Sequence, residues 1–251
     1  MSKIRDRRAK VHDFGRFVYL DMQKTGSTYT SKFLQHTCKL QEVRYEKHVP
    51  VRDSFSRTAF YFITIRHPLS LYSSLYRYGL DRRGGVFHRL EQANLLNVYS
   101  DFDEFLTFVL RPENAAVLGE GYTPDIARHI GFMSFRFLKL SLQYAFRNID
   151  LYTARKNSFW KFAFPTSVMN LQQQFITHLE IKNENLRDEL AHLALERFPE
   201  YFNETLVRAF LSEVDGANES KTKASQLDVA LSKNVLKTLK SREKLLWSRY
   251  N

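Results

Sequence analysis

A short apolar segment that passes through a polar turn into a helix constrains the fold of this chain more than any other stretch. Residues 17–22 are mostly apolar and include aromatic and β-branched side chains, which predicts a buried strand. The turn over 23–28 reads Q-K-T-G-S-T, and the following pattern predicts a helix over 27–39 with serine and threonine at its N-cap. Such a helix N-terminus favours an anion, because its N–H groups point outward and the helix dipole is positive there. With Lys24 adding a positive charge, the sequence predicts a phosphate-binding loop.

The order of lysine and glycine separates this loop from the one that binds nucleoside triphosphates. That loop reads G-x-x-x-x-G-K-[ST], with lysine after the last glycine and a hydroxyl placed for magnesium. Here Lys24 comes two residues before Gly26, and no glycine stands upstream within the loop. A P-loop kinase or NTPase therefore stays an alternative rather than the first hypothesis.

A second segment of the same kind lies further along the chain. Residues 60–65 read F-Y-F-I-T-I and predict another strand, which ends in Arg66-His67-Pro68. Pro68 suits the first position of a helix, which we expect to end near Gly79. Ser74 follows Arg66 by eight residues.

Taken together, K-T-G-S-T after one strand and R-x-P with a serine eight residues past the arginine resemble the two signatures of sulfotransferases that use 3′-phosphoadenosine 5′-phosphosulfate (PAPS). The resemblance implies that the first motif binds the 5′-phosphosulfate and the second binds the 3′-phosphate. The residues it implies for nucleotide binding are Lys24, Thr25, Gly26, Ser27 and Thr28 in the first motif, and Arg66 and Ser74 in the second.

The carbohydrate-type branch of the family is the most similar one, because R-H-P-L-S-L-Y-S-S-L-Y resembles its R-x-P-x-x-R-x-x-S-x-Y. Two positions depart from the family pattern: Gln23 stands where proline is common, and Leu71 where a second arginine is common. Leu71 removes one positive contact. The two motifs cover about the first third of the chain.

The resemblance also implies a general base and a loop that closes over the nucleotide. His48, in a Lys-His context between the motifs, is expected to take the proton of the acceptor, and its pKa near working pH suits that task. Glu46 is the alternative base. The polar segment over 215–225 is expected to touch the 3′-phosphate through Lys221, Lys223 and Ser225, or else to be a solvated linker.

The resemblance therefore implies an enzyme that moves the sulfuryl group of PAPS to an acceptor hydroxyl on a carbohydrate or glycoconjugate and leaves 3′-phosphoadenosine 5′-phosphate (PAP). Lys24 and His48 would be its catalytic residues, and no metal is expected. The remaining pattern predicts a strand over 174–181 and a helix capped by Asn183. It predicts further helices over 131–147, over 228–248 and over 102–110, the last with a cap within 100–103. The loop over 119–124 is expected to serve as an acceptor-binding lid.

Strand–loop–helix units require parallel neighbours, which predicts an α/β fold with a short, mostly parallel sheet and helices on both faces. The 251 residues suit a charged lead-in over 1–16 and a single domain over 17–251. Cys38 is the one cysteine of the sequence and is expected to be a packing residue.

The net charge of +11 suits an anionic partner such as a nucleotide, an acidic glycan, a nucleic acid or a membrane surface, or else a solvated face that favours solubility. The nucleotide is favoured by the motifs, while a basic nucleic-acid-binding module stays an alternative without a recognised motif. Because no apolar run approaches the ~18 residues of a membrane span, we expect a cytoplasmic, bacterial-type enzyme unless an anchor has been removed. Peripheral membrane contact stays open.

Overall fold

The computed structural model describes residues 12–43, 51, 55–142, 175–213 and 231–251. These residues form two compact units, each with its own packed interior. The sheet unit comprises the described residues of 1–65, 139–147 and 174–217, and the helical unit comprises those of 66–138 and 218–251. Four of the predicted site residues, His48, Lys221, Lys223 and Ser225, lie outside the described residues.

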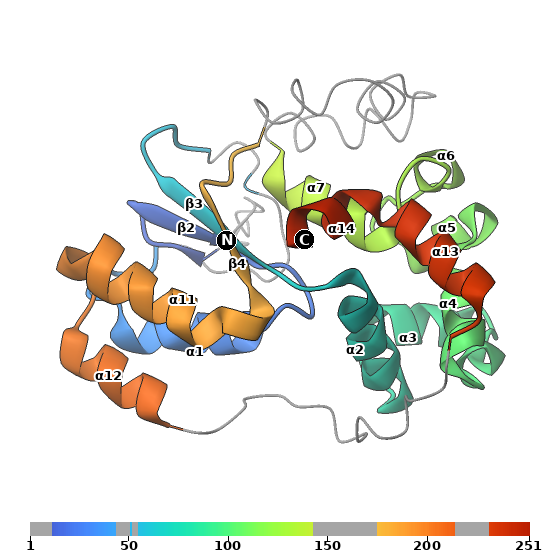
Figure 1. Cartoon of the computed structure of the whole chain (residues 1–251), viewed down its shortest axis with the longest axis horizontal. Coiled ribbons are helices and arrows are strands. Elements are labelled where there is room, and N and C mark those ends of the chain that lie inside the picture. The colour runs from blue at the N-terminus through green and yellow to red at the C-terminus, as the bar shows by residue number, and fades with distance from the viewer. Residues whose placement is uncertain (1–11, 44–50, 52–54, 143–174, 214–230) are drawn as a thin grey trace, which may run out of the picture. The chain divides into compact units, whose positions relative to one another are not determined.

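The sheet unit contains a four-stranded sheet with the strand order β1-β2-β3-β4 (Figure 1). Its strands are β1 His12–Asp13, β2 Phe17–Leu20, β3 Phe60–Ile65 and β4 Leu179–Lys182. β1 pairs antiparallel with β2, whereas β2 with β3 and β3 with β4 are parallel pairs. The sheet is therefore mixed, with two parallel strand pairs and one antiparallel pair, and the predicted α/β class is confirmed.

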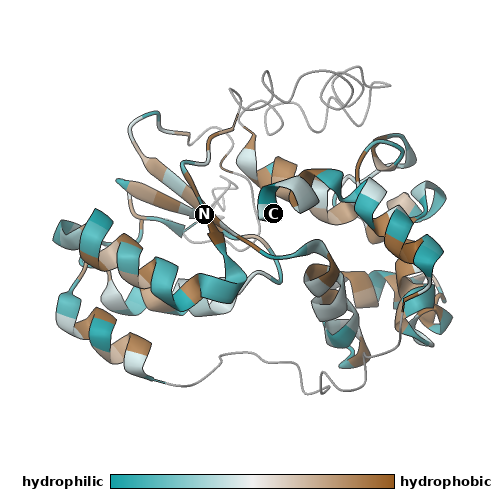
Figure 2. Ribbon diagram, in the orientation of Figure 1, coloured by the Kyte–Doolittle hydropathy of each residue, from teal (hydrophilic) through white to brown (hydrophobic). Residues whose placement is uncertain are grey.

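Both faces of the central strands are buried, which explains their nearly continuous apolar sequence. Phe17 and Tyr19 of β2 point into a cluster with Phe62 of β3 and Ile181 of β4. The alternating residues Val18, Leu20, Tyr61 and Ile63 are at most 2% exposed as well. Figure 2 accordingly shows brown, hydrophobic residues along the strands.

Three helices of the sheet unit lie on the same side of its sheet (Figure 1). They are α1 Ser27–Thr37, α11 Leu186–His192 and α12 Glu204–Ser212. Their inward residues join the same cluster, with Phe33 and Leu34 from α1, Leu186 and Leu190 from α11 and Val207 from α12. In Figure 2 these helices alternate between brown and teal, as expected for helices with one buried face.

A buried histidine attaches β1, which lies in the predicted lead-in, to the rest of the sheet unit. The His12 side chain has no exposed surface. Its Nδ1 is 2.5 Å from Glu42 Oε1, and its Nε2 is 2.6 Å from Ser31 Oγ on α1. Both ring nitrogens are thus satisfied, as burial of a polar ring requires.

The helical unit is built from α2 Pro68–Leu80, α3 Gly85–Gln92, α4 Phe102–Leu110, α5 Ala115–Leu118, α6 Pro124–Ala127, most of α7 Phe132–Ser141, α13 Lys233–Arg242 and α14 Lys244–Tyr250. α2 begins at Pro68, as predicted, and ends one residue past Gly79. α4 is capped by Asp101, whose side chain accepts from the Glu104 N–H at 2.8 Å.

Three other predicted elements need correction. The late strand occupies Leu179–Lys182 rather than 174–181, because pairing with β3 begins at Phe62 opposite Leu179. α7 is described only over Phe132–Ser141, and the rest of the predicted helix lies outside the described residues. Asn183 does not cap a helix: it begins a 3-10 turn over Asn183–Asn185 that leads into α11.

The predicted C-terminal helix over 228–248 is also wrong as a single element. Its described part forms two helices, α13 and α14, which are separated at Glu243. Glu243 has φ −95° and ψ 23°, and its side chain has no exposed surface. The break turns this carboxylate inward, where it accepts hydrogen bonds that the helical pattern of the sequence did not reveal.

Candidate functional site

The first motif forms a tight turn between β2 and α1, with two residues in the left-handed region. Lys24 has φ 68° and Gly26 has φ 87°. Gly26 is the N-cap of α1 and offers no side chain to its first turn, so the predicted serine or threonine cap is wrong. A left-handed backbone costs a residue with a side chain roughly 1–2 kcal/mol. Such strain at Lys24 is typical of a residue held in place for a purpose other than stability.

Glycine is required at position 26 because another segment approaches the loop closely. A Cβ at Gly26 would lie 2.5 Å from Leu186 Cδ2 and 2.7 Å from Asn183 Nδ2. Leu186 is buried, so it has little room to move aside. The stretch over 183–186 is the end of the I-K-N-E-N-L sequence after β4, which therefore supports the loop from the neighbouring crossover.

Thr25 ties the loop to the sheet through a chain of buried hydroxyl groups. The Thr25 hydroxyl donates to the Met22 carbonyl oxygen at 2.7 Å and is 2.6 Å from the hydroxyl of Thr64 on β3. Since Thr25 has one hydroxyl proton, Thr64 must donate to Thr25, and Tyr19, 2.8 Å away, must then donate to Thr64. Burial raises the pKa of Tyr19 well above its usual value, which keeps this donor protonated. The side chain of Thr25 therefore holds the turn against the sheet.

The two motifs follow neighbouring parallel strands. Leu20, the last residue of β2, pairs with Ile63 of β3, so these strands end at the same edge of the sheet. Ligands of open α/β sheets bind beyond that edge. Lys24 follows the end of β2 by four residues, and Arg66 directly follows β3. Arg66 is half-buried.

Ser74 lies on α2, in the helical unit, and is half-buried. Leu71, on the same helix, has no exposed surface and belongs to the core of that unit. An arginine at position 71 would place its charge in this core, which is costly without a partner.

Aromatic side chains of α14 contact the turn between β3 and α2. The ring of His67, which follows Arg66, is 4.6 Å from the ring of Trp247 and 5.2 Å from that of Tyr250, both measured between centroids. The interplanar angles of 69° and 78° are those of edge-to-face contacts, the favourable arrangement for aromatic rings. No motif in the sequence points to these three residues, because the contact joins positions about 180 residues apart.

Glu243 is a second feature for which the sequence pattern carries no signal. Its carboxylate accepts from the N–H groups of Met133 and Ser134 at 3.1 and 2.8 Å, at the N-terminus of α7. The hydroxyls of Ser134 and Tyr72 donate to it as well, at 2.6 and 2.5 Å. Burial raises the pKa of Glu243, and these four hydrogen bonds oppose the rise. A helix N-terminus is thus occupied by a carboxylate of the chain itself.

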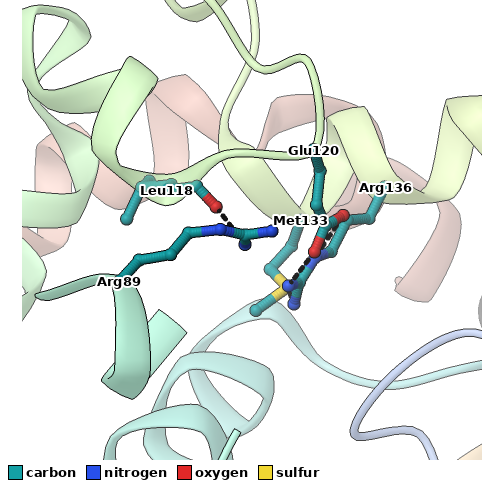
Figure 3. Close-up of polar contacts among 5 residues, drawn as sticks. All are labelled: Arg89, Leu118, Glu120, Met133 and Arg136. Atoms are coloured by element: carbon teal, nitrogen blue, oxygen red, sulfur yellow. Dashed lines mark hydrogen bonds and ion pairs between the residues drawn. The ribbon is translucent and has the colours of Figure 1, made fainter. Parts of the chain in front are cut away.

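Two arginines bond to the loop predicted as a flexible lid and to the residue just before it (Figure 3). Three consecutive residues, Gly119, Glu120 and Gly121, have φ between 62° and 80°. Arg136 donates to Glu120 through Nη2 at 2.6 Å and Nε at 3.2 Å, and Arg89 Nη1 donates to the Leu118 carbonyl oxygen at 2.7 Å. Arg136 thus holds the loop itself, and Arg89 holds the residue just before it; the role of the loop as an acceptor-binding lid stays a prediction.

The remaining predicted residues are placed as follows. Cys38 is half-buried and its pKa is raised, chiefly by burial, so it fits the expected packing role rather than that of a nucleophile. Among the residues described, no three His, Cys, Asp or Glu side chains gather into a group that could hold a metal ion. No helix in the described part of the chain is long and apolar enough to cross a membrane.

Comparison of this chain with models of protein families, with curated proteins and with solved structures found no match.

Proposed function

We propose that the protein is a PAPS-dependent sulfotransferase that transfers a sulfuryl group to a hydroxyl of a carbohydrate or glycoconjugate. The observation that carries the proposal is the strained turn at Lys24 and Gly26, which lies directly between a buried parallel strand and a helix N-terminus. A second arginine-bearing turn follows the adjacent parallel strand, as the two-motif resemblance requires. This combination supports a nucleotide with phosphates at both its 5′ and 3′ positions.

In this proposal the first motif holds the 5′ side of PAPS. Backbone N–H groups of residues 25–28, together with the Thr28 hydroxyl, bind the 5′-phosphate at the start of α1. As the acceptor oxygen bonds to sulfur, the bond between sulfur and the bridging phosphate oxygen breaks and leaves PAP. Lys24 stabilises the charge that develops on that oxygen, which is the electrostatic contribution of a preorganised cation.

The second motif holds the 3′ side. The Arg66 guanidinium, whose N–H groups match the geometry of a phosphate, and the Ser74 hydroxyl bind the 3′-phosphate. His48 takes the proton of the acceptor hydroxyl. Lys221, Lys223 and Ser225, which lie outside the described residues, are the side chains that the resemblance assigns to further contacts with the 3′-phosphate. PAPS is the donor substrate and no metal takes part in the scheme.

Thermal-shift titration tests the proposal against a P-loop kinase. The full chain is titrated with PAP, and with ATP with and without magnesium, alongside Arg66→Ala and the control Arg111→Ala, which removes an exposed arginine of the helical unit. A ligand at 100 times its Kd stabilises the folded state by about 2.7 kcal/mol, which raises Tm by roughly 5–10 °C in a chain of this size.

We expect PAP to raise Tm without metal in the wild type and in Arg111→Ala, but not in Arg66→Ala. A shift that requires both ATP and magnesium would favour the kinase. No shift with either nucleotide would refute the proposal and direct attention to nucleic acid, whose binding should weaken steeply with salt.

A further inference from the structure

The last helix of the chain holds the turn that carries the second motif. His67 is the residue next to Arg66 and the N-cap of α2, and its ring lies edge-to-face against Trp247 and Tyr250 at 4.6 and 5.2 Å. Trp247 and Tyr250 are three residues apart, so they lie on one face of α14. The Lys240 ammonium lies 5.3 Å from the centroid of the Trp247 ring, which adds a cation–π contact. His67 is thus fixed by two rings.

A second contact fixes the same end of α2. Tyr72, which lies in the second turn of α2, donates to Oε1 of Glu243 at 2.5 Å. Glu243 is the N-cap of α14, and its carboxylate is anchored in turn to the N-terminus of α7. Both ends of α14 therefore contact the start of α2: Glu243 bonds to Tyr72, and Tyr250 packs against His67. Because His67 and Tyr72 flank the first turn of α2, that turn cannot tilt without breaking one of the two contacts.

We propose that Trp247 and Tyr250 are positioning residues that fix Arg66 for the 3′-phosphate of the nucleotide, with His67 as the link. The inference rests on the proposed function and adds that α14 sets the preference for a nucleotide with a 3′-phosphate. An arginine binds a phosphate through parallel N–H bonds, and this directional arrangement tolerates little displacement of the guanidinium. The loop over 23–28 belongs to the sheet unit, whereas the two rings belong to the helical unit.

A purely structural role for the aromatic cluster makes a different prediction. Loss of packing alone would lower Tm and weaken the binding of every nucleotide to the same degree. Loss of positioning would weaken the binding of the nucleotide that carries a 3′-phosphate and leave the binding of the nucleotide that lacks it unchanged. The ratio of the affinities for PAP and for 5′-AMP therefore separates the two roles.

The experiment is calorimetric titration of the full chain with PAP and with 5′-AMP at one ionic strength. The variants are Trp247→Leu and Tyr250→Leu, with Trp247→Phe and Tyr250→Phe as conservative partners. Phe87→Leu is the matched control, because Phe87 is a buried aromatic residue of the helical unit that lies on α3. We expect the leucine variants to lose about tenfold of the preference for PAP while their affinity for 5′-AMP stays within about twofold.

The phenylalanine variants should keep the wild-type ratio of the affinities for PAP and 5′-AMP. Phe87→Leu should lower Tm but leave that ratio unchanged. If both leucine variants keep the wild-type ratio, the positioning role is refuted. Should Trp247→Leu fail to fold, Tyr250→Leu decides the question, since Tyr250 contacts the same His67 ring from α14. A wild type that binds PAP no better than 5′-AMP overturns the proposed function itself, and that result is read before any variant is compared.

Discussion

Replacement of Gly26 by alanine tests the support of the first motif by the segment after β4. The added Cβ would lie 2.5 Å from Leu186 Cδ2 and 2.7 Å from Asn183 Nδ2, on a backbone with φ 87°. Gly15 provides a matched control in the same unit, since its φ of 74° is similar but a Cβ added there would meet no atom within 4 Å. Both alanine variants share the strain of the left-handed backbone, and Gly26→Ala alone adds a steric collision with Leu186 and Asn183.

The expected magnitudes follow from these geometries. Alanine in the left-handed region costs roughly 1–2 kcal/mol, of which about 0.4–1 kcal/mol is recovered because the unfolded chain has less freedom. Gly15→Ala should therefore lower the free energy of unfolding by about 1 kcal/mol. Gly26→Ala should lose a further ~1–3 kcal/mol through overpacking against Leu186, because that side chain is buried and cannot simply rotate away.

Urea denaturation followed by far-ultraviolet circular dichroism measures both losses, provided that the slope with denaturant is unchanged. The double variant Gly26→Ala/Leu186→Ala should be less destabilised than the sum of its single variants, because removal of the leucine side chain relieves the collision. Equal losses in Gly26→Ala and Gly15→Ala, together with additive behaviour of the double variant, would show that Leu186 does not press against the loop.

Two further predictions concern Lys24, the catalytic residue of the proposed function, and the buried carboxylate of Glu243. Lys24→Gly should leave the free energy of unfolding unchanged or raise it by up to ~1 kcal/mol, since glycine relieves the strain at φ 68°. The rate at which PAP is released from PAPS in the presence of glycan acceptors should nevertheless fall about 10²–10³-fold. Lys32→Met on α1 is the control, and comparable turnover in the two variants would contradict the role of Lys24. Burial raises the pKa of Glu243 in the folded state, so its contribution to stability is full below about pH 4.5 and is lost as the pH rises through the folded pKa. Tm measured from pH 4 to 7 should therefore fall more steeply in the wild type than in Glu243→Gln, and parallel curves would refute this linkage.

Elements whose signals are local could be predicted from the amino-acid order alone. The apolar run over 17–22 predicted a buried strand, which occupies Phe17–Leu20, and the proline at position 68 predicted a helix start. Both were readable because strand propensity and a fixed proline φ act within a few residues. The cap of α4 was readable for the same reason, since the Asp101 side chain bonds to a backbone N–H three residues away. The turn between a strand and a helix at 23–26 was readable in the same way, whereas its binding of an anion stays a prediction.

Features that depend on residues far apart in the chain were set by tertiary contacts. The helical pattern over 228–248 is continuous, but the carboxylate of Glu243 bonds to α7, about 110 positions away, and the chain breaks there. Gly26 is required by Leu186, and the predicted lid is held by Arg136. In each case a buried polar group or a close approach outweighs the small free-energy differences of local propensity, because burial without a partner costs more than a lost turn of helix.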